Sequence, residues 1–204
     1  MNRILRSLTL VTCLVSSHLM AADGPKTKVL DAFNTIDPKT LKADEMKIKV
    51  VSTPDPIHHK ALEMVVDFAK PGAWPKLIKS FPAGTINPKK YSGIRFFAKS
   101  DTATKIHFGV IGPAEKDGKP MDYRVYNVVG KDTWTEFSLP FNTFKFPGYK
   151  AWKNGQQMVI PPGATLPEES LSLATGVVFS FRVEDRGNST VANFMVDGLE
   201  LIER

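Results

Sequence analysis

Short apolar stretches alternate with turn-forming residues along nearly the whole chain after residue 26. The stretches are rich in Val, Ile and Phe and are bounded by Gly, Pro, Asn or Asp, which is typical of antiparallel strands. The pattern predicts ten strands, at residues 28–33, 47–52, 61–69, 77–81, 93–99, 105–111, 123–129, 135–140, 176–184 and 192–202. Asp37 and Pro38, followed by Leu41 and Met46, fit one short helix capped by Asp37. The stretch from 142 to 170 is the longest without a predicted strand.

Ten half-buried strands exceed what one open sheet usually holds, so we expect an all-β fold of two packed antiparallel sheets, a β-sandwich. Alternation along a strand assigns side chains to opposite faces. The predicted inner face carries Ile94, Phe96, Ala98, Ile106, Phe108, Val110, Tyr123, Val125, Phe179, Phe181 and Val183. The predicted outer face carries Arg95, Phe97, His107, Arg124, Tyr126, Arg182 and Glu184. The sequence leaves open which of these strands share a sheet.

The composition fits one globular domain of 204 residues, with 42% hydrophobic and 24% charged residues. The formal net charge is +6, yet no dense run of Lys and Arg occurs. A nucleic-acid partner would require clustered positive charge, so that class is excluded by the pattern.

Residues 1–22 have the features of a signal peptide. Arg3 and Arg6 form a positive start, an apolar stretch follows, and Ala21 and Ala22 precede Asp23. The apolar run is interrupted and shorter than the roughly 18 to 20 residues that span a bilayer, which disfavours a membrane anchor. We therefore expect a secreted or periplasmic protein with a single domain at 23–204 and no membrane contact after cleavage. The only cysteine, at position 13, would be removed, leaving no disulfide.

Five short segments resemble a known superfamily in their order along the chain. They are Val29–Phe33, Ala61–Met64, Tyr91–Phe96, Asp132–Pro140 and Phe194–Leu201. Together they are similar to the jelly-roll domains of the galactose-binding-like superfamily. Within this superfamily, the chain resembles the family 11 carbohydrate-binding modules, the modules attached to agarases and the complex I intermediate-associated family. The resemblance implies a jelly roll that binds a polysaccharide or oligosaccharide, with a protein partner or assembly role as the alternative.

A sugar site needs an aromatic surface for the C–H face of the ring, with polar side chains at its edges. The candidates are Arg95, Phe97, His107, Arg124, Tyr126, Tyr149, Trp152, Arg182 and Glu184. Several of them are cationic, which favours an acidic glycan. By contrast, Trp74 and Trp134 are interpreted as packing residues. If Phe146, Tyr149 and Trp152 form one exposed apolar patch, they fit a protein partner, and if they border a polar groove, they fit a glycan.

Enzymatic function has weaker support, and we expect a non-catalytic protein. The acidic residues show no recognisable pairing of the kind that glycoside hydrolysis needs. The strongest enzymatic alternative is a polysaccharide lyase, in which Tyr126 or His107 takes the proton next to a uronate while Arg124 or Arg182 neutralises its carboxylate.

No cofactor is required by any of these hypotheses. The resemblance nevertheless implies a structural calcium ion near the first and last strands, with Asp31 and Asp197 as ligands. Calcium takes six to eight oxygens, so backbone carbonyls would have to complete the site. The alternative is that Asp31 caps a turn while Asp197 and Gly198 form an ordinary strand kink.

Overall fold

The computed structural model describes residues 24–69, 74–102, 104–114, 120–129, 131–146, 148–153, 156–160, 162–163, 165–181 and 190–204. The predicted signal peptide lies outside these residues, as do Arg182, Val183 and Glu184, so those predictions stay untested. No helix within the described ranges is long and apolar enough to cross a membrane.

Strands dominate the described chain. They are β1 (Thr27–Asp31), β2 (Leu41–Asp44), β3 (Met46–Ser52), β4 (Lys60–Asp67), β5 (Lys76–Ser80), β6 (Tyr91–Ser100), β7 (Thr104–Ala114), β8 (Pro120–Val129), β9 (Thr135–Pro140), β10 (Tyr149–Lys153), β11 (Gln156–Ile160), β12 (Gly176–Ser180) and β13 (Val191–Glu203). All ten predicted strands are present, most with ends that differ by only a few residues. β2, β10 and β11 were not predicted, and neither were the 3-10 helix η1 (Phe141–Thr143) and the helix α1 (Glu168–Ser172).

The short helix expected after Asp37 is wrong. The Asp37 carbonyl accepts hydrogen bonds from the backbone N–H groups of Thr40 and Leu41, and its carboxylate accepts one from Lys39 N. This closes one turn, after which Leu41 begins β2 and is buried. Pairing β2 with β5 buries Leu41 in the core, and this tertiary contact outweighs the local preference for a helix start.

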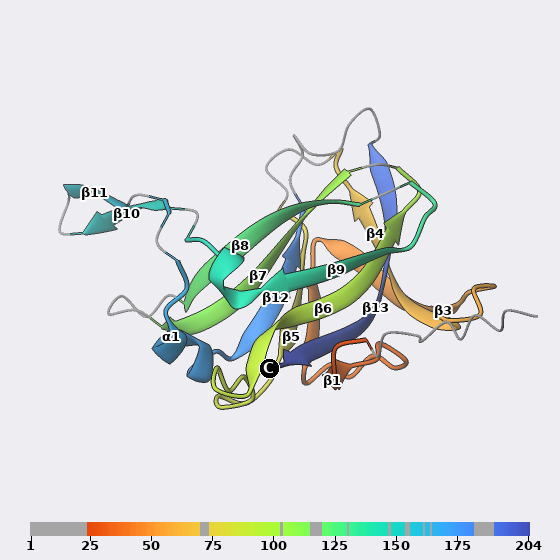
Figure 1. The fold of residues 1–204 in the computed structure, drawn as a ribbon. Helices are drawn as coiled ribbons and strands as arrows, with labels where there is room; N and C mark the ends of the chain where they lie inside the picture. Colours follow the sequence, from red (N-terminus) through yellow and green to blue (C-terminus); the bar gives the residue numbers. More distant parts are fainter. Residues whose placement is uncertain are drawn as a thin grey trace, which may run out of the picture.

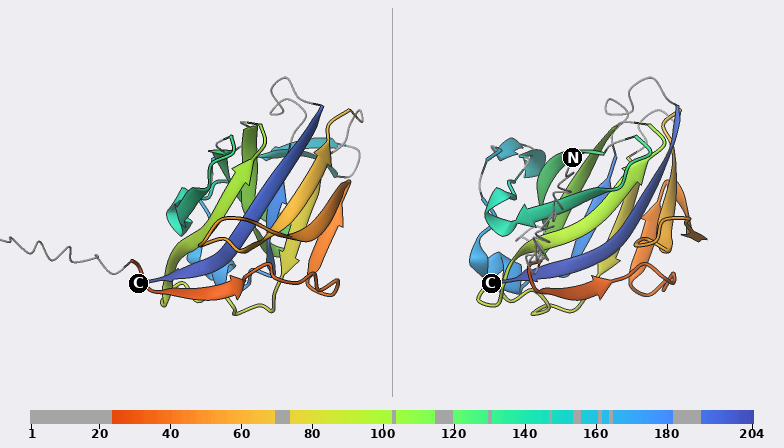
Figure 2. Two further views of the ribbon diagram at one scale, coloured as in Figure 1. Left: turned by 90° about the vertical axis from the view of Figure 1, so that its right-hand side faces the viewer. Right: turned by 45° about the vertical axis from the view of Figure 1, so that its right-hand side comes forward.

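Two antiparallel sheets pack face to face (Figure 1). The first sheet has the order β3-β4-β13-β6-β9, with β1 also paired to β13, and the second has the order β2-β5-β12-β7-β8. Figure 2 shows β13 running the length of the first sheet, with β1 along one end of the sandwich. β10 and β11 form a separate hairpin that extends away from the two sheets (Figure 1).

Phenylalanine rings fill the space between the sheets. Phe96 of the first sheet lies with its ring centre 4.8 Å from that of Phe108 and 5.1 Å from that of Phe179, both in the second sheet. The predicted inward residues of β6, β7 and β12 are fully buried, which confirms the alternation: Ile94, Phe96, Ala98, Ile106, Phe108, Val110 and Phe179. Since side chains alternate along a strand, the intervening residues must face the two outer surfaces of the sandwich.

Candidate functional site

The register of the second sheet places a row of side chains across its outer face. Val178 of β12 is opposite Ile78 of β5 on one side and Gly109 of β7 on the other. Gly109 is in turn opposite Arg124 of β8. The next outward row runs from Lys76 through Ser180 to His107, and the backbone of Tyr126 is paired opposite His107. Sequence segments up to about a hundred residues apart therefore meet on one surface.

A groove of about 310 Å³ lies on this outer face. It is lined by Trp74, Lys76, Ile78, Ile111, Arg124, Val178 and Ser180. Trp74 precedes β5 and is 40% exposed. The guanidinium carbon of Arg124 lies 4.9 Å from the centre of the Trp74 ring, which is the geometry of a cation–π contact. The groove therefore has an aromatic wall that is held in place by an arginine.

Glycine at position 109 shapes the floor of the groove. A Cβ atom on Gly109 would lie 3.1 Å from Val178 Cγ1 and 3.3 Å from Arg124 Cγ, closer than most such contacts. The missing side chain lets the aliphatic stem of Arg124 lie across β7, from where its guanidinium reaches Trp74. Gly109 therefore allows the Arg124–Trp74 contact without contributing a group of its own.

The groove combines two kinds of surface. Ile78, Ile111 and Val178 offer apolar contact, while Arg124 and Lys76 supply cationic hydrogen-bond donors. The Lys76 ammonium lies 3.3 Å from the carboxylate of Asp44, and both groups are partly exposed. An aromatic wall, an apolar floor and polar donors at the edges are the elements that a sugar ring needs.

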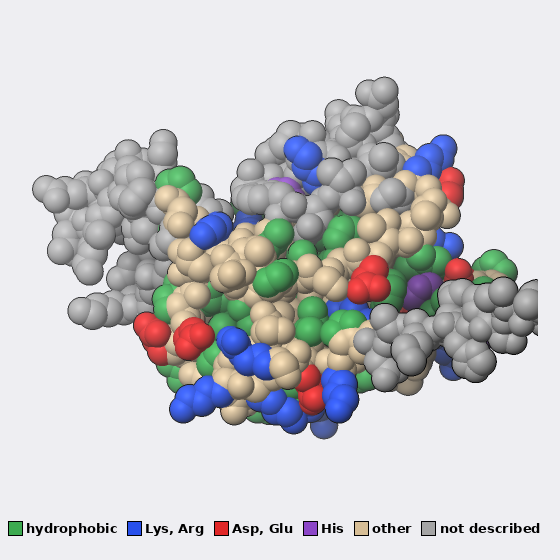
Figure 3. Space-filling view, in the orientation of Figure 1, with side chains coloured by type: hydrophobic (Ala, Val, Ile, Leu, Met, Phe, Trp, Pro, Cys, Tyr) green, Lys and Arg blue, Asp and Glu red, His purple; other side chains and the backbone are tan. Residues whose placement is uncertain are grey.

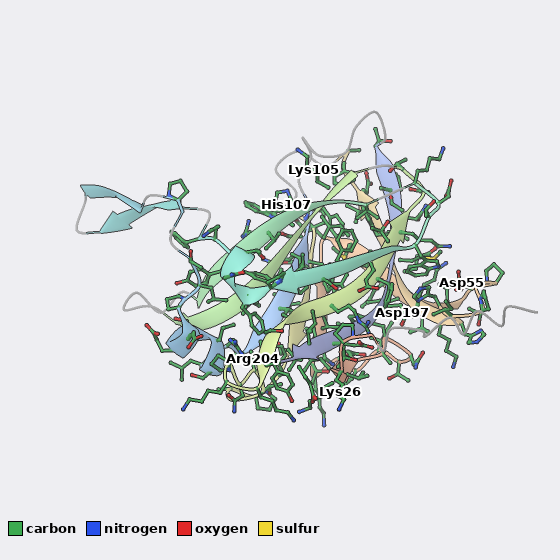
Figure 4. All side chains as sticks on the ribbon, in the orientation of Figure 1. Lys26, Asp55, Lys105, His107, Asp197 and Arg204 are labelled. Atoms are coloured by element: carbon green, nitrogen blue, oxygen red, sulfur yellow. The ribbon has the colours of Figure 1, made fainter. Side chains whose placement is uncertain are left out.

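The predicted outward residues do not share one face, since the structure divides them between the sheets. Arg95 and Phe97 lie on β6 in the first sheet, whereas His107, Arg124 and Tyr126 lie in the second. His107 is only 2% exposed, so the prediction that its side chain forms part of an open surface is wrong. It lies on β7, which is paired with β12 on one side and β8 on the other, so it is in the middle of the sheet and not at its edge. Figure 4 labels His107 and the exposed Lys105 on β7.

Arg95 and Phe97 have partners within the first sheet. Arg95 Nη2 lies 2.6 Å from Glu200 Oε2, and the guanidinium carbon is 5.7 Å from the Phe97 ring centre. The Phe97 ring also packs against His58, with ring centres 4.6 Å apart. Trp134, predicted to be a packing residue, contacts His58 from the other side at 4.3 Å. These residues form a cluster on the face opposite to the groove.

The structure says less about the remaining aromatic candidates. Tyr126 lies in β8, and Tyr149 and Trp152 lie in β10, but the structure describes only their backbone. Phe146, which would have to be exposed beside Tyr149 and Trp152 to form an apolar patch for a protein partner, is buried and packs on Tyr123 with ring centres 6.0 Å apart. It is therefore no part of an exposed patch, because it helps to fill the core.

The two predicted calcium ligands already have protein partners. One Asp31 carboxylate oxygen accepts a hydrogen bond from Phe33 N at 2.6 Å, and the other lies 2.5 Å from Lys79 Nζ. Asp197 Oδ2 lies 2.8 Å from His58 Nδ1. The described residues contain no group of three or more His, Cys, Asp or Glu side chains suited to a metal ion. The calcium site stays a prediction.

Trp74, which the sequence analysis assigned to packing and not to a sugar site, contacts Arg124 and also lines the groove. Its ring is among the most exposed large apolar groups of the described chain and lines the groove. The available signal was position: Trp74 lies two residues before Lys76, the first residue of β5, and so has the same parity as the outward residues Lys76 and Ile78.

Known proteins share this architecture. Neither a family model nor a curated protein matches the sequence. Among solved structures, a family 11 carbohydrate-binding module from a cellulosomal cellulase of Clostridium thermocellum has a TM-score of 0.63 at 20% identity, over 89% of this chain and 96% of that chain. A family 11 module from the same organism, in complex with a β-1,3-1,4-mixed-linked tetrasaccharide, has a TM-score of 0.62 at 20% identity, over 86% and 95%.

An exo-β-agarase is also similar, with a TM-score of 0.61 at 11% identity over 86% of this chain and 25% of that chain. At these identities the likeness defines the fold. This chain has the jelly-roll fold of carbohydrate-binding modules, as its sequence segments predicted. The resemblance to the complex I intermediate-associated family stays a prediction.

Proposed function

We propose that this chain is an exported, non-catalytic carbohydrate-binding module that binds a polysaccharide in the groove beside Trp74. The observation that carries the proposal is the exposed Trp74 ring, stacked on Arg124 above an apolar floor. Sugar rings stack on aromatic faces through their C–H groups, while their hydroxyls bond to charged donors at the rim. The jelly-roll fold shared with family 11 modules supports the same class of ligand.

An acidic polysaccharide is the favoured ligand. Arg124 and Lys76 line the groove, and Lys42 and Lys105 are exposed on strands of the same sheet. An arginine recognises a carboxylate or sulfate through paired hydrogen bonds, and its planar group is already oriented by the Trp74 ring. Two acids offset part of this positive charge: Asp44 lies against Lys76, and the Glu45 carboxylate accepts a hydrogen bond from Trp74 N at 2.5 Å.

The direct test is affinity electrophoresis of the mature protein in gels that contain a neutral β-glucan, a polyuronate or a sulfated galactan. We expect retardation in all three gels. It should be at least as strong in the polyuronate and sulfated gels as in the neutral gel. Calorimetry of the best ligand then measures the affinity of the wild type and of Arg124→Ala. Absence of retardation in every gel would remove the proposal.

Two alternative functions give different results in the same experiments. A protein-interaction domain of this fold would copurify with one stoichiometric protein partner and show no glycan retardation. A polysaccharide lyase would release unsaturated uronate ends from the polyuronate, which are detected by their ultraviolet absorbance. The lyase alternative draws on the register that places His107 opposite Tyr126, with Arg124 two residues away on β8. We expect no such product, because the side chain of His107 is buried.

Export is tested separately. We expect the chain, expressed with residues 1–22 in a bacterial host, to leave the cytoplasm with a new N-terminus near Asp23, as mass spectrometry would show. For calcium, the ion pair between Asp31 and Lys79 and the hydrogen bond between His58 and Asp197 favour structural roles for the two carboxylates. We therefore expect the same melting temperature in calcium and in chelator. A rise in calcium would support the ion site, since a ligand of the native state stabilises it.

A further inference from the structure

A second cluster of polar residues lies on the first sheet, on the side of the sandwich opposite to the groove. The connection between β3 and β4 folds against this sheet and buries His58, which is 5% exposed. The His58 ring is held between Phe97 and Trp134, and its Nδ1 atom lies 2.8 Å from Asp197 Oδ2. Figure 4 shows Asp55 and Asp197 on this side, well apart from His107.

Hydrogen bonds within the same connection hold its backbone in place. The Asp55 carboxylate accepts hydrogen bonds from the N–H groups of Ile57 and His58, both at 2.9 Å. Thr53 N donates to the carbonyl of His59 at 2.9 Å, which closes the loop. These contacts leave Ile57 at the tip, 78% exposed. These hydrogen bonds therefore hold the side chains of the loop in a defined position.

A pocket of about 450 Å³ opens between this loop and the segment that follows β1. It is lined by Ala32, Asn34, Ile57, His59, Lys60 and Asp197. Asp197 lies at an irregularity of β13, where the pairing with β6 shifts and Gly198 adopts a φ of 61°. This bulge and the hydrogen bond from His58 orient the Asp197 carboxylate, which is 17% exposed, at the wall of the pocket. The volume is within the roughly 300–1,000 Å³ of small-molecule sites.

The lining selects a hydroxylated, uncharged ligand. Asp197 is an acceptor, Lys60 is a donor, and the Asn34 amide is both, so the pocket suits groups that donate and accept at once. Vicinal hydroxyls of a sugar have this property, and Ile57 and Ala32 offer apolar contact to its C–H groups. A bare cation is disfavoured by the Lys60 ammonium beside it, and Figure 3 shows that this face carries charges of both signs. An anion would meet the Asp197 carboxylate.

We propose that this pocket, centred on Asp197 and Lys60, is a second site that binds a single neutral sugar residue. It lies on the first sheet and shares no residue with the groove on the second sheet. One short oligosaccharide cannot reach around the sandwich to occupy both. The two sites therefore bind independently, and a protein with both can hold two glycan chains.

The test is a titration of ¹⁵N-labelled protein with the methyl glycosides of glucose, galactose and mannose, followed by amide chemical shifts. At least one glycoside should shift the amides of Asn34, Ile57 and Lys60 in a saturable manner. Lys60→Ala removes a charged donor and Asp197→Asn replaces a charged acceptor by a neutral one, so each should weaken this binding about tenfold or more. Asparagine keeps an acceptor for His58, so the loop should remain folded, as an unchanged melting temperature would confirm.

Lys47→Ala is the matched control, since Lys47 is exposed on β3 and does not line the pocket. The titration is repeated in Trp74→Ala, which removes the aromatic wall of the groove. Persistent shifts around Lys60 in that variant support a separate site, whether or not the groove binds glycans. The inference is overturned if none of the glycosides shifts these amides, if Lys47→Ala weakens binding as much as Lys60→Ala, or if chelator abolishes binding, which would indicate a cation site.

Discussion

Replacement of Trp74 by alanine tests the groove most directly. The ring is 40% exposed, and its exposed surface is what a bound sugar would cover. A tryptophan can remove up to about 250 Å² from water, so the exposed share is about 100 Å². At about 25 cal/mol per Å², covering all of it would contribute about 2.5 kcal/mol, and covering one ring face about half as much. Trp74→Ala should therefore weaken glycan binding between about 8-fold and about 60-fold.

The same substitution should cost little stability. The contact with the Arg124 guanidinium is at the protein surface, where a cation–π pair contributes roughly 0.5–1 kcal/mol. For a domain of this size that corresponds to a fall in melting temperature of about 1–4 °C. Isothermal titration calorimetry with the polysaccharide that gives the strongest retardation measures the first quantity, and thermal unfolding followed by circular dichroism measures the second.

Trp134→Phe is the control, because Trp134 packs on His58 in the opposite sheet and should not affect the groove. Two results would refute the reasoning. If Trp74→Ala folds normally and binds with wild-type affinity, the ring does not contact the glycan. If the variant loses several kcal/mol of unfolding free energy, Trp74 is a packing residue after all, as the sequence alone suggested.

Three further predictions concern charge, backbone conformation and pH. Arg124→Ala should weaken binding of a polyuronate about tenfold and make that binding less dependent on salt, while the affinity for a neutral β-glucan changes less. The control variant Lys47→Ala should change neither affinity. Equal losses of affinity for both glycans would contradict an acidic ligand. Gly198→Ala should lower the melting temperature by about 2–4 °C, since a φ of 61° costs a residue with a Cβ atom about 1 kcal/mol, whereas Gly24→Ala, with open space and ordinary φ, should not. Backbone N–H groups that donate to Asp55 hold the pKa of its carboxyl below the ordinary 3.8. The stability that the Asp55 carboxylate gives the loop is therefore complete above pH 3.8 and is lost as pH falls through the lowered pKa. Amide exchange in residues 55–59 should accelerate in that acidic range in the wild type but not in Asp55→Ala.

Local patterns determined most of the strands and the direction of their side chains. Alternation in segments such as Ile94, Phe96 and Ala98 depends only on the period of a strand, and these residues are buried as predicted. Where a segment is short, local signals were insufficient: Leu41 follows a good helix start, yet it forms a strand because β5 is there to pair with it. β10 and β11 were missed because each is only five residues long, and Tyr149 to Ala151 or Met158 to Ile160 is too short a run to separate a strand from a loop.

The sequence by itself determined that the chain is a two-layer β fold with an aromatic core, because burial of one face imposes a period of two on every strand. Only the tertiary structure decided which outward residues meet. Arg95 and Arg124 have the same outward pattern, yet they lie on opposite surfaces because β6 and β8 belong to different sheets. Trp74 and Arg124 are fifty positions apart, and their contact depends on a strand order in which β5, β12, β7 and β8 are adjacent. Strand order is set by the packing of the whole core, so no local pattern carries it.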